Sequence, residues 1–467
     1  MNITLEKQPS RRAGGKSWRL FWLGVPLVSL GLWLSRSDVP MRLQAWRSRT
    51  FSPLEAPYRY PFLDSRSGNS DPAVAIQQQI AHFQARVRQH PESGLEQAAL
   101  AAAYFKMGRT TGEGNWYLLA EQTAQQSWAK LPFENTEALA VLARVAEARH
   151  DFPTALRLAS DLKPEDAASL RITANLAMGN LAAAHQAATE LVDLTLSFNA
   201  FMLLAMVQQA QGDNEAALQS FRHALEVEEA GDLSNSARLR TLLGRFFAEQ
   251  GDLSQAQAFY QEALQILPHY PLALLNLAQL ELRQDNLATA ERYYAQLSRT
   301  GSSPYLPLIR RGQAQIQYRR GNTQAANARW SEAEMLLRQT AAAGDATFGH
   351  QRDLARLLLE RGRSQDRAEA LALMQTEVTI RRDASTLDTY AWALASNGRW
   401  LEAQQVIQEA LALGSRDAAL VYRASTIEQA LGNSSSAQAY LQRAWMIDPQ
   451  LNEQAIATQH LSVGLGE

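Results

Sequence analysis

The chain has 467 residues, of which 46% are hydrophobic and 20% are charged, and its formal net charge at pH 7 is −2. It contains no cysteine, which excludes disulfides, thiolate zinc sites and cysteine nucleophiles together. The first fifty residues carry nine Lys and Arg against two acids, so their net charge is +7 and that of the remaining 417 residues is −9. An acidic body argues against nucleic acid as a partner, whereas the basic N-terminal region suits an anionic lipid surface.

After a basic tail, residues 1–19, the chain enters an apolar segment, residues 20–34, with the sequence LFWLGVPLVSLGLWL. A helix from Trp18 to Trp33 would span roughly 24 Å, slightly less than the core of a bilayer. Basic and aromatic side chains at both ends suit the two interfaces of a membrane. We expect a transmembrane anchor that contacts the membrane through residues 18–36. A signal peptide cleaved near residue 37 and a soluble helix stay open as alternatives.

Five Lys and Arg precede the apolar segment and four follow it, which is a weak signal for orientation. Because the opposite topology would export most of the charged tail, we expect the N-terminus in the cytoplasm and the rest of the chain on the exoplasmic (periplasmic or lumenal) side. Residues 35–72 contain five prolines and are typical of an extended linker. Beyond the linker, apolar residues at helical spacing between Val74 and Val87 predict a helix that covers the start of the next region.

A short stretch, residues 251–264 with the sequence GDLSQAQAFYQEAL, shows the unit from which that region is built. Gly251 can adopt the left-handed conformation that ends a helix, and Asp252 suits the N-cap of the next one. Ala256, Tyr260 and Ala263 share one helical face, where small residues allow close approach and the ring fills the gap. Together with the preceding LGRFF, the stretch predicts a helical hairpin.

The turn of this hairpin recurs ten times, at intervals that average 36 residues. The turn markers are Gly108, His150, Gly179, Gly212, Gly251, Asp285, Gly321, Gly362, Gly398 and Gly432. Seven of them precede a predicted N-cap: Asp151, Asn180, Asp213, Asp252, Asn286, Asn322 and Asn433. Alanine stands five residues after eight of them, at Ala155, Ala184, Ala217, Ala256, Ala290, Ala326, Ala403 and Ala437. The boundaries are least regular over 108–180 and 330–384.

With these residues in register, residues 94–451 resemble the tetratricopeptide repeat family, whose helical pairs follow a W-x2-L-G-x2-Y…A-x3-F…P pattern. The best match, residues 237–270, has Leu243, Gly244, Phe247, Ala256, Tyr260, Ala263 and Pro268 in register, with Arg240 in the place of the Trp. The resemblance implies an all-α fold, a right-handed superhelical α-solenoid of about ten hairpins. We expect it to occupy residues 73–461, with capping helices at both ends, after one N-terminal hydrophobic helix.

Motifs of catalysis and metal binding are scarce. The sequence SRRAGGKS at 10–17 imitates a phosphate-binding loop, but Ser10 stands where the first glycine belongs and no strand precedes it. The eight histidines are scattered and none has the i,i+4 spacing of a metal site. We therefore expect no enzyme, no metal, no cofactor and no small-molecule substrate.

The resemblance also implies that the first helix of each pair lines a concave groove for a partner peptide. Transferring the inward positions gives Arg238, Thr241, Arg245, Gln279, Arg311, Gln315, Tyr318 and Trp392, together with Met202 and Met206. The arginines predict an acidic or C-terminal carboxylate peptide, with the two aromatic residues as anchors. The alternative is that the arginines pair internally, with residues such as Glu249 or Glu281.

These observations predict a membrane-tethered scaffold or adaptor that binds a protein partner through the groove in order to recruit or assemble a complex. Two alternatives remain at this stage. One is an exported, soluble assembly or chaperone factor after signal cleavage. The other is a non-catalytic regulatory subunit of an envelope enzyme.

Overall fold

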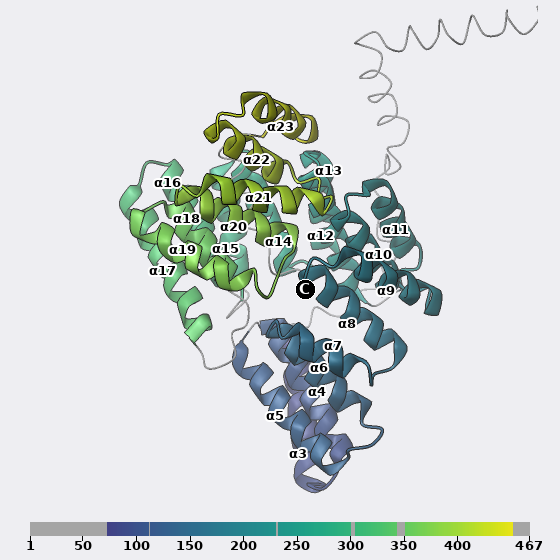
Figure 1. Ribbon diagram of the computed structural model, residues 1–467. Coiled ribbons are helices and arrows are strands. Elements are labelled where there is room, and N and C mark those ends of the chain that lie inside the picture. The colour runs from purple at the N-terminus through teal and green to yellow at the C-terminus, as the bar shows by residue number, and fades with distance from the viewer. Residues whose placement is uncertain (1–71, 112, 230–231, 300–303, 343–350, 452–467) are drawn as a thin grey trace, which may run out of the picture. The chain divides into compact units, whose positions relative to one another are not determined.

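The computed structural model describes residues 72–111, 113–229, 232–299, 304–342 and 351–451. The apolar segment 20–34 and the expected C-terminal cap beyond residue 451 lie outside these ranges. Every helix or strand in the described ranges is an α-helix, and they are labelled α3 to α23 in Figure 1. None of these helices is both long enough and apolar enough to cross a membrane.

The helices pair in sequence into ten hairpins, each made of a first and a second helix, and α3 (Pro72–Gln89) precedes them. Ile76 and Ile80 of α3 are buried against α4. The hairpins are α4 (Gly94–Thr111) with α5 (Gly114–Lys130), α6 (Thr136–Ala148) with α7 (Phe152–Ala159), α8 (Pro164–Ala177) with α9 (Leu181–Leu194), α10 (Phe198–Ala210) with α11 (Asn214–Glu226), α12 (Leu233–Glu249) with α13 (Leu253–Ile266), α14 (Pro271–Arg283) with α15 (Leu287–Ser298), α16 (Leu306–Arg319) with α17 (Thr323–Ala342), α18 (Gln351–Arg361) with α19 (Ser364–Glu377), α20 (Ala384–Ser396) with α21 (Trp400–Ala412), and α22 (Ala418–Ala430) with α23 (Ser434–Ile447).

Nine of the ten predicted turn markers lie between the helices of a hairpin and have positive φ, as the left-handed turn requires: His150, Gly179, Gly212, Gly251, Asp285, Gly321, Gly362, Gly398 and Gly432. The prediction for Gly108 is wrong, because this residue lies inside α4. A Cβ at Gly108 would stand 3.1 Å from the ring of Tyr117 in α5. The glycine therefore serves the close packing of the two helices, as Gly244 does beside the ring of Tyr260.

The residues after the turn markers divide by chemistry. The side chains of Asp151, Asp213 and Asp252 accept a hydrogen bond from the backbone amide three residues on, at 3.1–3.2 Å, which confirms them as N-caps. The side chains of Asn180, Asn286 and Asn433 make no such bond. They donate instead to the side chain five residues earlier, as Asn286 does to Glu281 at 2.9 Å and Asn433 to Glu428 at 2.7 Å. An amide can donate as well as accept, so the asparagines tie the turn to the helix before it.

The helix contacts follow the predicted small–large–small pattern. Ala256 and Ala263 have no exposed surface, and Tyr260 between them is 2% exposed. The other alanines of this position are buried as well: Ala155, Ala184, Ala217, Ala290, Ala326, Ala403 and Ala437. Small side chains at this place let first and second helices pack closely in every hairpin that has them.

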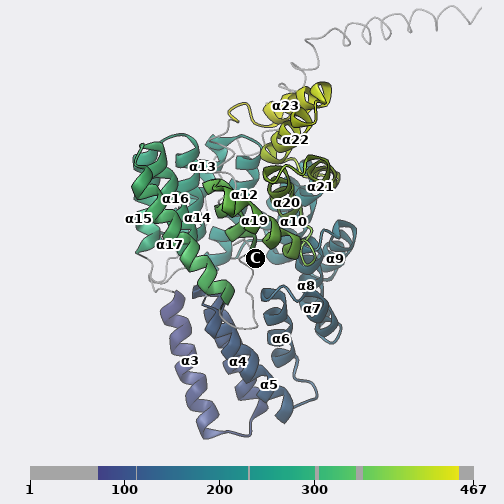
Figure 2. The same ribbon diagram turned by 60° about the vertical axis from the view of Figure 1, so that its left-hand side comes forward.

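Turns far apart in the sequence meet along a line that we call the seam. The amide of Arg382 donates to the carbonyl of Ala177 at 2.9 Å, beside Gly179. Gly212 lies against the backbone of Gly414, and Gly251 against the backbone of Asp448. Each of these contacts joins residues about 200 positions apart. In Figures 1 and 2, helices α20–α22 accordingly lie beside α10 and α12.

Candidate functional site

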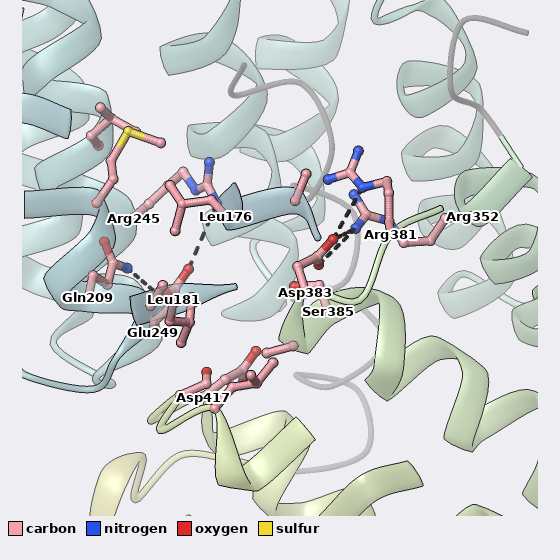
Figure 3. A pocket seen from close by; sticks show the side chains of 17 residues that line it. Leu176, Leu181, Gln209, Arg245, Glu249, Arg352, Arg381, Asp383, Ser385 and Asp417 are labelled. Atoms are coloured by element: carbon pink, nitrogen blue, oxygen red, sulfur yellow. Dashed lines mark hydrogen bonds and ion pairs between the residues drawn. The ribbon is translucent and has the colours of Figure 1, made fainter. Parts of the chain in front are cut away.

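A cavity of about 230 Å³, the seam pocket, lies where the two sides of the seam meet. Helices α8, α9, α10 and α12 provide one wall of it, and α18, the start of α20 and the connection before α22 provide the other. Figure 3 shows Gln209, Arg245 and Glu249 on one side of the pocket, Arg352, Arg381 and Asp383 on the other, and Asp417 below them. The lining residues include Leu176, Leu181, Met206, Gln209, Ala210, Leu242, Arg245 and Glu249 on the first wall, and Arg352, Arg381, Asp383, Leu413 and Asp417 on the second.

One end of the pocket holds an ion cluster around Asp383, the N-cap of α20. Nη1 of Arg352 is 3.2 Å from one carboxylate oxygen of Asp383, and Nε of Arg381 is 3.2 Å from the other. Burial alone would raise the pKa of Asp383, but the two guanidinium groups and the hydrogen bonds from Thr386 hold this pKa well below its usual range. Asp383 is therefore ionised at neutral pH, and both arginines already have a carboxylate partner.

The other end holds two carboxylates, one from each wall. Glu249, in the last turn of α12, accepts a hydrogen bond from Gln209 at 2.6 Å and lies 3.9 Å from Arg245. Asp417 is the N-cap of α22 and accepts from the backbone amide of Ala419 at 2.7 Å.

Both carboxylates at this end hold their protons more tightly than usual. Burial raises the pKa of Glu249, against the opposing effects of Arg245 and Gln209. Burial, together with the negative charges of Glu249 and Asp388, raises the pKa of Asp417 to about 7. The Glu249 side chain is 38% accessible, and it lines the seam pocket. At this end, burial thus favours the protonated form of both carboxylates.

Apolar side chains occupy the space between the two charged ends. Leu176 and Leu181 come from either side of the turn at Gly179, and Met206 and Leu242 from the first helices α10 and α12. Leu413, just beyond α21, meets them from the opposite wall. The seam brings these apolar side chains together with the polar residues of the pocket.

The structure places the predicted groove residues in several environments. Arg245 lines the seam pocket, as does Met206. Arg311 is 2% exposed, and its Nε lies 2.5 Å from Glu360, to which the amide of Gln315 also donates. Thr241 is buried and donates to the carbonyl of Ala237 at 2.8 Å.

None of the remaining predicted groove residues lines the seam pocket. Gln279 is buried and Met202 is 1% exposed, whereas Arg238 is half-buried. Tyr318 is 60% exposed and lies with its ring centroid 5.7 Å from that of Trp330. The guanidinium carbon of Arg423 lies over the ring of Trp392, 4.6 Å from the centroid of that ring. The internal pairing considered for the arginines is thus found for Arg311 with Glu360, whereas Arg245 approaches Glu249 only to 3.9 Å, without a hydrogen bond.

None of the groove residues predicted from the sequence lies on the second wall of the pocket. Arg352, Arg381, Asp383 and Asp417 lie close to the first wall only because of the seam, which joins parts of the chain about 200 residues apart. One signal was available. The sequences RRDAS at 381–385 and SRDAA at 415–419 both place an N-capping aspartate at the start of a first helix. Neither of these two sequences shows that the helices they begin lie near α10 and α12.

Residues 196–269 and residues 247–306 each match a model of the tetratricopeptide repeat family. These matches show that the chain contains tetratricopeptide repeats at residues 196–306, and the ten hairpins described above have the paired-helix architecture of such repeats. Tetratricopeptide repeats generally serve as protein-interaction scaffolds.

Among individual proteins, the chain is similar to the uncharacterized protein ycf37 of Pyropia yezoensis, with 43% identity over 58 residues, or 12% of this chain. The matched part spans about a third of the length of that protein. Two solved structures of human IFIT1 dimers show a more distant likeness. The one with m7Gppp-AAAA has a TM-score of 0.40 at 14% identity over 79% of this chain and 76% of that chain. The one with PPP-AAAA has a TM-score of 0.38 at 15% identity over 75% and 72%.

Proposed function

We propose that the chain is a scaffold that binds a segment of a partner protein, with the seam pocket receiving one side chain of that segment. The observation that carries this proposal is the pocket itself, where charged and apolar side chains from two distant parts of the array converge on one cavity. Packing alone does not require such convergence, which is typical of a recognition site. The cavity of about 230 Å³ is smaller than the usual site for a small molecule, roughly 300–1,000 Å³. It is better matched to one side chain of a larger partner.

The scaffold is tested by filling the pocket. Ala210 lines the cavity, so the substitution Ala210→Phe should fill it and abolish capture of the partner by the full-length protein from a detergent extract. Ala439→Phe is the matched control, because Ala439 is exposed on α23. The melting temperatures of both variants should stay within a few degrees of wild type. Undiminished capture by a folded Ala210→Phe variant would exclude the pocket as the site.

As the second part of this proposal, the scaffold is tethered to a membrane by residues 20–34, with the repeats on the exoplasmic side. Its support is the sequence, namely an apolar segment with tryptophans and arginines at both ends, followed by a proline-rich linker. The full-length protein should then stay in the membrane fraction after carbonate extraction. Release into the supernatant, with a mature N-terminus near Asp38, would instead establish the exported, soluble assembly or chaperone factor.

A further inference from the structure

We propose that the seam pocket takes the side chain of a lysine or arginine of the partner segment, with its cationic head between Glu249 and Asp417. This inference rests on the proposed function and adds the chemistry of the partner. It also reverses the sequence-based expectation of an acidic peptide.

The end of the pocket that holds Glu249 and Asp417 offers acidic groups to a cation. Glu249 and Asp417 approach from opposite walls, and the cation nearest Glu249, Arg245, stands at 3.9 Å, beyond hydrogen-bonding distance. Arg283 also interacts electrostatically with Asp417, but it forms a buried ion pair with Asp448. A cationic head would therefore find two carboxylates that the fold has not fully compensated.

The other charged groups around the pocket are already paired. Asp388, whose negative charge acts on Asp417, accepts a hydrogen bond from Arg423 at 2.6 Å. Arg352 and Arg381 share Asp383, as described above. An anionic ligand would have to compete with Asp383 for these guanidinium groups, so the pocket favours a cation over an anion.

Apolar side chains line the way to that end of the pocket. Leu242, Met206 and Leu413 line the space between the charged ends. Lysine and arginine carry three or four methylene groups behind the charge, and such stems pack along apolar surface while the head stays polar. A cavity of about 230 Å³ holds one long side chain of this kind, with little room to spare. Shape and charge therefore agree on the same occupant.

The affinity of the pocket for a cation should depend on pH. A cation beside Asp417 stabilises the ionised carboxylate, so binding must release the proton that Asp417 holds below about pH 7. Affinity should consequently rise by about tenfold between pH 6 and pH 8, where the ionised fraction of such a group rises by that factor. Titration calorimetry in buffers of different ionisation enthalpy should detect the released proton.

The experiment uses three blocked amino acids as probes: the N-acetyl methylamides of arginine, lysine and citrulline. Citrulline has nearly the shape of arginine but carries no charge. We expect the full-length wild type to bind the arginine and lysine probes at least tenfold more tightly than the citrulline probe at pH 8. Equal binding of arginine and citrulline would overturn the proposal.

Two isosteric substitutions locate the site. Glu249→Gln keeps a partner for Gln209, and Asp417→Asn keeps an N-cap for α22. The double variant should bind the arginine probe at least tenfold more weakly than wild type and lose the pH dependence. Asp232→Asn, at the exposed N-cap of α12, is the matched control and should bind as wild type does. Unchanged binding by the double variant would also overturn the proposal.

The experiments distinguish a wrong chemistry of the occupant from a wrong location of the binding site. If Ala210→Phe abolishes partner capture while the double variant Glu249→Gln/Asp417→Asn captures the partner fully, the pocket is a binding site but its occupant is not a cation. If the double variant loses capture and Asp232→Asn retains it, the cationic occupant is supported with the natural partner.

Discussion

At the scale of single residues, Arg240 shows what a family pattern leaves out. It stands where tetratricopeptide repeats commonly have tryptophan, yet it has no exposed surface. Its guanidinium forms a buried ion pair with Glu228 and lies 3.1 Å from Glu262. The sequence predicted the position of Arg240 in the helix but not its partner, because Glu228 belongs to the irregular connection before α12, where no periodicity applies.

Replacing Arg240 should therefore destabilise the fold strongly. Arg240→Met leaves Glu228 buried without its partner, and losses of this kind cost about 3–5 kcal/mol. The free energy of unfolding from denaturant titration measures the loss. Adding Glu228→Gln to this variant should restore part of the stability, because the uncompensated charge is removed. An Arg240→Met variant as stable as wild type would show that Glu228 finds water or another cation.

A second prediction at the residue scale concerns Asp417, whose contribution to the free energy of unfolding depends on pH. Its pKa of about 7 in the folded state lies above that of an exposed aspartate, so the folded state binds the extra proton. The stabilisation from this group is complete below about pH 4 and is lost as pH rises through 7.

Asp417→Asn, which keeps the N-cap without the charge, should thus gain stability relative to wild type as pH rises from 5 to 8, by about 1–3 kcal/mol. Denaturant unfolding at both pH values measures it. Asp232→Asn should show no such gain, because Asp232 is an exposed N-cap outside the pocket. A gain for Asp417→Asn that is the same at pH 5 and pH 8 would contradict the explanation.

At the scale of elements, the hairpins were predictable because their signals are local. A left-handed glycine, a capping aspartate and an alanine at a fixed spacing each act within one or two turns of helix. Gly108 marks the limit of this reasoning. The sequence does not distinguish a glycine that ends a helix from a glycine that makes room for the ring of Tyr117. Only the packing of the helices distinguishes them.

The turn glycines themselves divide into two groups, which permits a matched comparison. Gly212 and Gly432 both have positive φ, so alanine at either position costs about 1–2 kcal/mol of backbone strain. At Gly432 an added Cβ has no described atom within 4 Å. At Gly212 it would meet the backbone of Gly414 across the seam, which adds about 1–3 kcal/mol of overpacking. Gly212→Ala should therefore be clearly less stable than Gly432→Ala in thermal melts, and equal melting temperatures would argue against the seam in solution.

At the scale of the whole molecule, the seam changes how a repeat array is stabilised. In an open solenoid each repeat contacts only its neighbours, and the end repeats unfold first. Here the contacts at Gly179, Gly212 and Gly251 join repeats about 200 residues apart, and the pocket depends on them. The sequence period predicts the repeats but not which of them meet, because small rotations between neighbouring hairpins accumulate along the array. This is why the first wall of the pocket held two of the predicted residues and the second wall held none.

Arg283 and Asp448 provide the test at this scale. Their ion pair ties the end of α23 to α14, with 5% and 0% of the two side chains exposed. Arg283→Ala leaves Asp448 buried without its partner, which costs about 3–5 kcal/mol, and the loss should fall mainly on the C-terminal hairpin that the pair holds in place. Hydrogen exchange should then accelerate in α22 and α23 more than in α14 and α15. Arg320→Ala is the control, because Arg320 and its partner Glu291 are both largely accessible and such pairs contribute about 0.2–1 kcal/mol. If exchange in Arg283→Ala rises evenly over all described hairpins, the array unfolds as one cooperative unit. If it does not rise at all, the seam contributes nothing at this point.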